Sequence, residues 1–352
     1  MLNEKKLTII CISRNRHPFL KRLILAYSQS NYHLLIADDS FDKWDWPETG
    51  GFGLLTWEYF SSSDSRPGKS YVNRFFIAAQ LVGTEFVCFV DDQEVIFPFG
   101  LDSAIHELRL NHSISCAGGT VSTLQRNNDG QIVLGKWGRR SDYYSITLPT
   151  PIERMRQVIT DTRTANLYYQ VMRKDLVIDF ARKIQKANFQ YHSAIEIFLA
   201  LYLLKHGKWS MGCYPYWIRV VGPPNKSDVE EYMTTEEIHW ITESLFEDTS
   251  EIKDRISLSK EIEDTWGRSS LEASVQESTW FVSFSNKLVA CLKHIVVRIP
   301  YLREILIKLL RKPLTYVSIK ELFESQYFLS DKTLLEIAHF EAVLRTYPNG
   351  IR

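Results

Sequence analysis

An apolar run of strand-forming residues over 85–90 ends abruptly in two adjacent carboxylates, Asp91 and Asp92. In an open α/β sheet, ligands bind beyond the carboxyl ends of the strands. Carboxylates at such a point cost solvation free energy unless they are exposed, paired or bound to a metal. Two of them suit a hard divalent cation, which proteins often share with phosphate. The segment therefore predicts a buried strand whose carboxyl end belongs to a site for a nucleotide diphosphate.

Short apolar strands alternate with helices over the first part of the chain. Leu7–Ser13 is β-branched and apolar on both faces, which is typical of a fully buried strand. His17 and Pro18 open the next helix, since Pro is favoured in a first turn. This alternation predicts a mainly parallel sheet. The strands are expected at 7–13, 32–37, 54–60 and 85–90, and the helices from residue 17 and over 70–82.

A second strand also ends in a carboxylate pair, Asp38 and Asp39. The carboxyl ends of parallel strands meet at one edge, so both acidic pairs can converge on one crevice. A single pair is more often a helix cap or a loop, but two pairs in one fold favour a site. Further strands are expected at 113–121, 165–172 and 215–221, an apolar helix at His192–His206, and mainly helices after about residue 230.

The bulk properties of the 352 residues narrow the class of protein. Apolar residues make up 45% and charged residues 24%, as in a globular chain, and a formal net charge of zero argues against nucleic-acid binding. Five scattered cysteines form neither a CxxC pair nor a zinc spacing. The first residues lack the apolar core of a secretory signal, and no apolar run is long enough to span a membrane. We therefore expect a cytoplasmic protein.

A basic segment at 287–312 contains seven Lys and Arg residues against a single acid, Glu304. Apolar residues fill most positions between them, and Pro300 divides the segment into two short helices. Basic amphipathic helices bind anionic membrane surfaces, which predicts a peripheral contact with the inner face of the membrane. A dimer helix, or a helix that packs on the main domain and solvates its Lys and Arg, fits the pattern equally well.

The order and spacing of these elements resemble the GT-A nucleotide-sugar glycosyltransferases, particularly the family-2-like group. Their pattern is a strand with a polar loop, a strand ending in Asp-Asp-Ser, a helix containing Asn, a strand ending in Asp-x-Asp, and an acidic residue opening an apolar helix that ends in Gly. The corresponding segments here are 9–14, 36–40, 69–73, 89–93 and 195–207. The resemblance implies a Rossmann-like GT-A domain with a mainly parallel sheet over 1–230 and a helical C-terminal extension over 231–352.

The resemblance also implies a nucleotide pocket at the carboxyl edge. It assigns Asp39 to the base or ribose, with Asp38 in support, and Asp91 to the ribose or a metal-bound water. The other pocket residues that it implies are Ser13 and Arg14, which line the nucleotide, and Lys69 and Asn73, which lie near the diphosphate.

A divalent cation, Mn²⁺ or Mg²⁺, is part of the same implication, with Asp91, Asp92 and position 93 as its ligands. The family's second motif carboxylate is an amide here, Gln93. Either Asp92 or Glu94 substitutes for it, or metal binding is weak.

Glu196 is the candidate general base in an inverting transfer, which needs a carboxylate to take the proton of the acceptor hydroxyl. His192, one turn earlier, is the rival base. Glu196 could equally be a charge placed favourably against the dipole of a helix N-terminus.

The expected function is transfer of a sugar from a nucleotide donor to a glycan or lipid-linked acceptor. The resemblance connects this with cell-surface polysaccharide assembly, such as capsule or O-antigen. A nucleotidyltransferase remains an alternative, although the loop 13–18 lacks the glycines usual there. A non-catalytic glycosyltransferase-like scaffold is a third interpretation, and Gln93 supports it.

Overall fold

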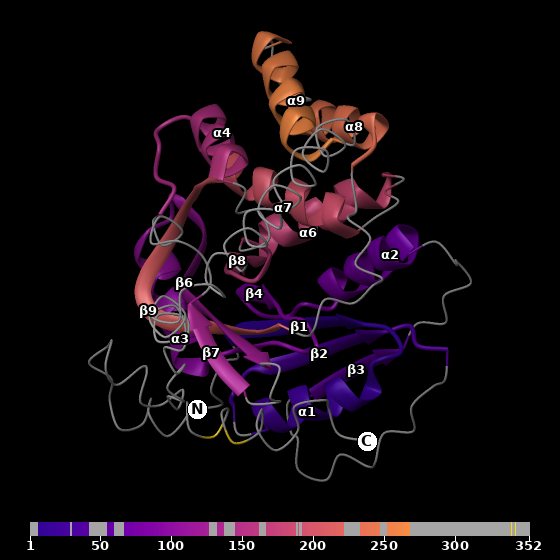
Figure 1. The fold of residues 1–352 in the computed structure, drawn as a ribbon, viewed down its shortest axis with the longest axis vertical. Helices are drawn as coiled ribbons and strands as arrows, with labels where there is room; N and C mark the ends of the chain where they lie inside the picture. The colour runs from indigo at the N-terminus through magenta and orange to yellow at the C-terminus, as the bar shows by residue number, and fades with distance from the viewer. Residues whose placement is uncertain are drawn as a thin grey trace, which may run out of the picture.

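One mixed sheet forms the centre of the structure (Figure 1). The computed structural model describes residues 6–28, 30–41, 55–59, 67–126, 132–136, 145–161, 167–187, 189, 192–221, 233–246 and 252–267, together with 339 and 342. Within these residues the sheet has nine strands in the order β3-β2-β1-β4-β8-β6-β9-β5, and β7 pairs with β6. The strands are β1 (Leu7–Ser13), β2 (His33–Asp38), β3 (Leu55–Tyr59), β4 (Phe86–Phe89), β5 (Val95–Ile96), β6 (Ile114–Arg126), β7 (Ile132–Lys136), β8 (Val171–Arg173) and β9 (Lys208–Val221).

The N-terminal half of the sheet is parallel, as the sequence predicts. β1 lies between β2 and β4, and β3 extends the sheet beyond β2. Ser13 is opposite Asp38, and Ile10 is opposite Phe89. The loops that follow β1, β2 and β4 therefore emerge at one edge, which brings both acidic pairs together.

The other half of the sheet mixes directions. β8 is antiparallel to both β4 and β6, β5 is antiparallel to β9, and β6 runs parallel to β9 over most of its length. The α/β fold class is confirmed, but the expected strand over 165–172 is wrong in extent. Leu167 and Tyr168 form a helical turn, and only the strand from Val171 pairs. The aromatic residues of this segment have high strand propensity, but packing in the core decides their conformation.

Helices cover both faces of the sheet (Figure 1). α1 lies on one face, and α2, α6 and α7 lie together on the other. In α1, Pro18 occupies the first turn, and Leu20, Leu23 and Ile24 form the buried stripe of an amphipathic helix. The helices in these layers are α1 (His17–Tyr27), α2 (Pro67–Gln80), α3 (Pro98–Leu110), α4 (Pro151–Asp161), α6 (Lys174–Gln185) and α7 (His192–His206).

α7 has the bounds that the sequence predicts, and it is apolar around its whole circumference. Such a helix has to be buried on all sides, and its residues from Ile197 to Leu204 are all buried. It contacts α2 and α6 on one side and α4 and α8 on the other. The helix is therefore a rigid element that fixes the position of Glu196 near its start.

Two further helices, α8 (Thr235–Leu245) and α9 (Ile252–Trp266), stack beyond α4 and α7 (Figure 1). α8 begins with a capping box in which Thr234 and Glu237 satisfy each other's backbone N–H groups. The helical character expected after residue 230 is confirmed for these two helices, whereas the domain boundary stays a prediction. The basic segment 287–312 lies outside the described residues. Among the described helices, none has the length and hydropathy needed to cross a bilayer.

Candidate active site

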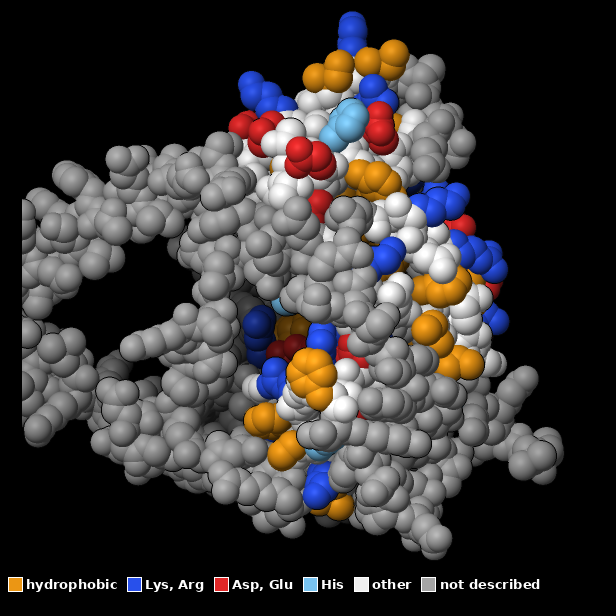
Figure 2. Space-filling model, turned by 90° about the vertical axis from the view of Figure 1, so that its right-hand side faces the viewer, with side chains coloured by type: hydrophobic (Ala, Val, Ile, Leu, Met, Phe, Trp, Pro, Cys, Tyr) orange, Lys and Arg blue, Asp and Glu red, His pale blue; other side chains and the backbone are white. Residues whose placement is uncertain are grey.

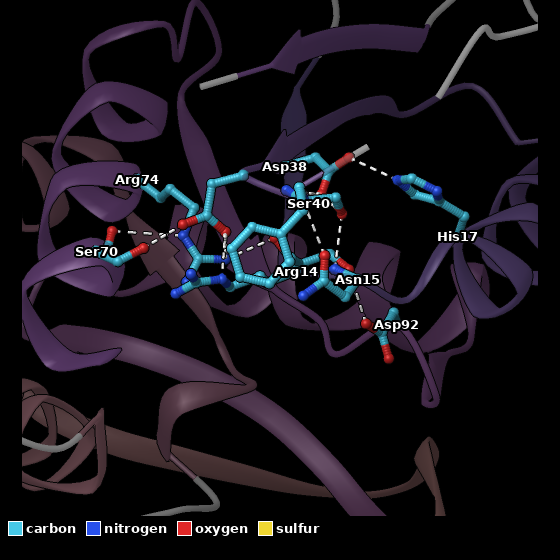
Figure 3. Close-up of polar contacts among 11 residues, drawn as sticks. Arg14, Asn15, His17, Asp38, Ser40, Ser70, Arg74 and Asp92 are labelled. Carbon is cyan, nitrogen blue, oxygen red and sulfur yellow. Dashed lines mark hydrogen bonds and ion pairs between the residues drawn. The ribbon is translucent and has the colours of Figure 1, made fainter. Parts of the chain in front are cut away.

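Arg74 joins the ends of β1 and β2 to helix α2. Its Nη1 donates a hydrogen bond to the carbonyl oxygen of Ser13 (2.6 Å) and lies 3.0 Å from Oδ1 of Asp39. Ser70, one turn earlier on α2, donates its hydroxyl to the other oxygen of Asp39. Figure 3 shows both α2 side chains reaching toward the end of the sheet from the same helix. The carboxylate of Asp39 is fully buried, so this contact anchors α2 to the site edge.

Asp38 organises the loop between β1 and α1. Its carboxylate accepts hydrogen bonds from the backbone N–H (3.1 Å) and hydroxyl (2.5 Å) of Ser40 and lies 3.1 Å from Nε2 of His17. The backbone N–H of Asn15 donates to the Ser40 hydroxyl oxygen at 2.7 Å. Asn15 has a φ of 57°, in the left-handed region that Asn tolerates. His17 and Ser40 therefore hold Asp38 in place (Figure 3), and its expected support of Asp39 stays a prediction.

Asp92 turns inward from the end of β4. One oxygen accepts a hydrogen bond from the Ser13 hydroxyl (2.9 Å), and the other lies 3.0 Å from Nε of Arg16. Burial raises the pKa of Asp92 to about 7, although the charge of Arg16 opposes that rise. Asp92 therefore connects the end of β4 to the loop after β1.

Glu94 is also buried, and Nε of Arg219 on β9 lies 3.3 Å from it. Burial raises the pKa of Glu94 well above its usual value, and Asp91 adds to the rise while Arg219 opposes it. Gln93 lies between Asp92 and Glu94 in the chain. Its backbone carbonyl accepts a hydrogen bond from the buried Arg22 (2.8 Å). Desolvation lowers the pKa of Arg22 to about 10. Arg16 at the N-cap of α1, Arg22 within α1 and Arg219 on β9 thus fix the turn after β4.

Asp91 differs from its neighbours because it is exposed. Its carboxylate accepts a hydrogen bond from the hydroxyl of Tyr169 at 3.1 Å. The Tyr169 ring stacks on the buried Trp217, with 4.2 Å between ring centroids. A rigid aromatic pair therefore holds Asp91 where it is accessible to a ligand.

Asp91 and Glu196 approach the same group of tyrosines, although more than 100 residues separate them. The hydroxyls of Tyr71 and Tyr168 are hydrogen-bonded to each other. Burial is the main cause that raises the pKa values of Tyr71, Tyr168 and Tyr169, and the charges of both Asp91 and Glu196 add to it in all three. The structure thus brings the candidate base to the edge where the strands end.

Glu196 is the fifth residue of α7, and the first turn of that helix contains no acid. The acid that was expected to open the apolar helix therefore lies one residue beyond its first turn. The helix dipole stabilises charges mainly within the first turn. This position weakens the interpretation of Glu196 as a favourable N-terminal charge.

The remaining predicted residues lie on α2 and α7. α2 begins at Pro67 rather than at the expected residue 70, so Lys69 belongs to its first turn. Asn73 is exposed one turn later on the same helix face. His192 is exposed, and its ring centroid lies 6.0 Å from that of Tyr71. Of the three, His192 has a contact with the tyrosines of the site, and the roles of all three residues stay predictions.

Sequence reasoning missed several residues that shape this site. The segment 14–16 reads as a polar loop, although Arg16 is the ion-pair partner of Asp92. Ser70 and Arg74 have the spacing of one helix face, which indicates that this face is polar. The spacing does not show that both side chains contact Asp39. Tyr169 falls in a segment that reads as a strand, so the pattern does not show its contact with Asp91. Figure 2 shows acidic and basic side chains close together in a recess of the surface, as such ion pairs require.

The sheet, the helices on both of its faces and the polar edge define a GT-A-type glycosyltransferase fold. Solved structures of S. aureus TarS have a similar fold. Residues 1–349 of TarS in complex with UDP-GlcNAc match with a TM-score of 0.53 and 16% identity, over 98% of this chain and 92% of that one. The same TarS fragment without ligand gives a TM-score of 0.51 at 15% identity, over 97% and 91% of the two chains. A longer TarS chain is covered over 44% of its length.

No family model matches the sequence, and neither does any curated protein. The likeness to TarS, at this identity, establishes the fold. Membership of the family-2-like group stays a proposal.

The residues after β4 do not fit the metal centre that the resemblance implies. Within the described part of the chain, no group of three or more His, Cys, Asp or Glu side chains is arranged to hold a metal ion. Both oxygens of Asp92 have partners, and Gln93 offers a neutral amide in place of a carboxylate. Asp91 is the one exposed carboxylate of this turn.

Proposed function

We propose that this chain is a glycosyltransferase that uses a nucleotide-sugar donor. The observation that carries the proposal is the exposed Asp91, held by Tyr169 where β1, β2 and β4 end, with the start of α7 nearby, since His192 of α7 lies beside Tyr71. Ligands of open α/β sheets bind at this edge. The GT-A fold supports the same function, and TarS with this fold is seen with UDP-GlcNAc and with UDP. A uridine diphosphate sugar is therefore the first donor to test.

The donor occupies the crevice after β1, β2 and β4 in this proposal. Arg14 lies at the mouth of the crevice, with its guanidinium 4.9 Å from the centroid of the exposed Phe41 ring and 4.0 Å from Asp39. Ser13 and Asp38 fix the loop around the nucleotide through the contacts described above. Asp91 meets the ribose or the diphosphate, because it is the accessible carboxylate of the β4 turn. Lys69 and Asn73 border the diphosphate from α2.

The reaction proceeds with inversion at the anomeric carbon. Glu196 takes the proton of the acceptor hydroxyl as that oxygen attacks the anomeric carbon. The bond from that carbon to the diphosphate oxygen breaks, and the nucleoside diphosphate leaves with the electron pair. His192 is the alternative base, since it approaches the same tyrosine group. Basic side chains offset the charge that develops on the leaving group.

The acceptor is a glycan or a lipid-linked sugar, and the biological setting is surface polysaccharide assembly, such as capsule or O-antigen. Both statements rest on the family-2-like resemblance of the sequence. The basic segment 287–312 provides a peripheral membrane contact in this proposal.

A thermal-shift panel of UDP, GDP, CDP and dTDP sugars tests the donor class. A ligand that binds only the folded state stabilises it by about 2.7 kcal/mol at about 100 times its Kd, which corresponds to a rise in Tm of roughly 4 °C for a chain of this length. We expect a selective rise with one nucleotide and a smaller rise in Asp91→Asn. Asp175→Asn is the matched control, because Asp175 is exposed near the opposite end of β4. No rise with any nucleotide would favour the non-catalytic scaffold.

A further inference from the structure

The carboxylates at the proposed donor edge already have cationic partners from this chain. Asp92 meets Arg16 at 3.0 Å, and Glu94 meets Arg219 at 3.3 Å. Both carboxylates are buried. A divalent cation that used either one would have to displace an arginine and leave its charge without compensation.

Residue 93 offers no replacement for these ligands. The amide of Gln93 is neutral, whereas hard cations bind most strongly to charged oxygen ligands. Its backbone carbonyl is directed to Arg22, which is only 1% exposed, at 2.8 Å. Both oxygens of residue 93 are therefore neutral, and the carbonyl oxygen already accepts a hydrogen bond from Arg22.

Arg16 and Arg219, in contrast, remain partly exposed beside the turn after β4. Their side chains are 41% and 37% exposed, and each pairs with a carboxylate that lies within three residues of Asp91. A guanidinium has five N–H donors, so contact with one carboxylate does not exhaust its capacity. Its planar fork also matches the geometry of phosphate oxygens. The ion pairs hold both arginines in place before a ligand arrives, which lowers the entropy cost of binding.

We infer that the arginines Arg16 and Arg219 bind the diphosphate of the donor, and that donor binding does not require a divalent cation. This inference rests on the proposed function and specifies how its donor is recognised. Arg16 also lies over the ring of Phe19, 5.0 Å from its centroid, which limits the orientations of the guanidinium. The competing arrangement is a cation held by Asp91 together with the phosphates.

Calorimetric titration of the full chain with UDP distinguishes the two arrangements. We expect the same Kd, within about threefold, in EDTA and in Mg²⁺ or Mn²⁺, because the charge of the ligand is balanced by arginines. Arg16→Gln and Arg219→Gln are each expected to weaken UDP binding by roughly 10- to 100-fold, as the loss of a charge-assisted hydrogen bond implies. Arg16→Lys should recover part of the loss, since the charge is kept but the fork is not.

Arg109→Gln is the matched control. Arg109 is an exposed arginine paired with Glu85, just before the start of β4 and away from its carboxyl end. Its substitution should leave the Kd unchanged, and thermal unfolding should show that all variants are folded. UDP binding that disappears in EDTA, returns with Mn²⁺ and tolerates both glutamine variants would overturn the inference while leaving the proposed function intact. A wild-type chain that binds none of the nucleotides of the thermal-shift panel, in EDTA or in Mg²⁺ or Mn²⁺, would overturn both.

Discussion

Replacing Glu196 with Gln is expected to lower kcat by roughly 10²- to 10⁴-fold, the usual contribution of a general base. The amide has nearly the same shape but cannot accept the proton of the acceptor hydroxyl. Donor affinity should stay within about threefold of the wild type, because the base acts on the acceptor. The measurement is the release of nucleoside diphosphate with acceptor present, together with calorimetric titration of the donor.

Two further variants serve as a control and as a test of the rival base. Glu236→Gln removes an exposed carboxylate from the first turn of α8 and should leave kcat unchanged. His192→Gln tests the rival base, and we expect it to lower kcat only modestly. Unimpaired turnover in Glu196→Gln would remove Glu196 from the mechanism. A large loss in His192→Gln alone would assign the base to His192.

Replacing Arg74 with Met is expected to destabilise the protein by about 3–5 kcal/mol, because it leaves the buried carboxylate of Asp39 without its closest cation. The backbone carbonyl of Ser13 loses a donor at the same time. Methionine keeps most of the side-chain volume, so the effect is mainly electrostatic. Urea unfolding followed by circular dichroism measures the change in the free energy of unfolding.

The double variant Arg74→Met with Asp39→Asn should recover a substantial part of that loss, because the uncompensated charge is then removed. Arg109→Met is the control, since its ion pair with Glu85 is exposed and contributes at most about 1 kcal/mol. An Arg74→Met variant as stable as the Arg109→Met variant would show that the ion pair does not anchor α2 to the sheet.

The sequence predicts those helices and strands whose apolar pattern and terminating residues lie within one short segment of the chain. β1 and α7 have the expected bounds because both are apolar on every side and end at polar or glycine residues. The antiparallel half of the sheet was not predicted, because strand pairing between β4, β8 and β6 joins segments far apart in the chain. Only contacts made in the folded core decide that pairing.

The sequence likewise predicts part of the site, namely which carboxylates lie at the edge of the sheet, but not their exposure or their partners. The sequence placed two Asp pairs at one edge, and the structure confirms that placement through the register of β1 with β2 and β4. The sequence does not show that Asp91 is exposed while Asp92 is buried. In a turn, the exposure of two adjacent side chains depends on where the backbone bends, and the residue pattern does not specify that point. The arginine partners of Asp39, Asp92 and Glu94 were not predicted as partners, because a charge pattern does not specify its contacts.

Hydrogen–deuterium exchange, with and without a saturating nucleotide sugar chosen from the thermal-shift panel, tests whether a donor binds at this edge of the sheet. We expect slower exchange in the peptides that cover 13–17, 38–40 and 91–94, because these loops enclose the ligand. Unchanged exchange in all three segments, or protection confined to α8 and α9, would contradict donor binding at this edge.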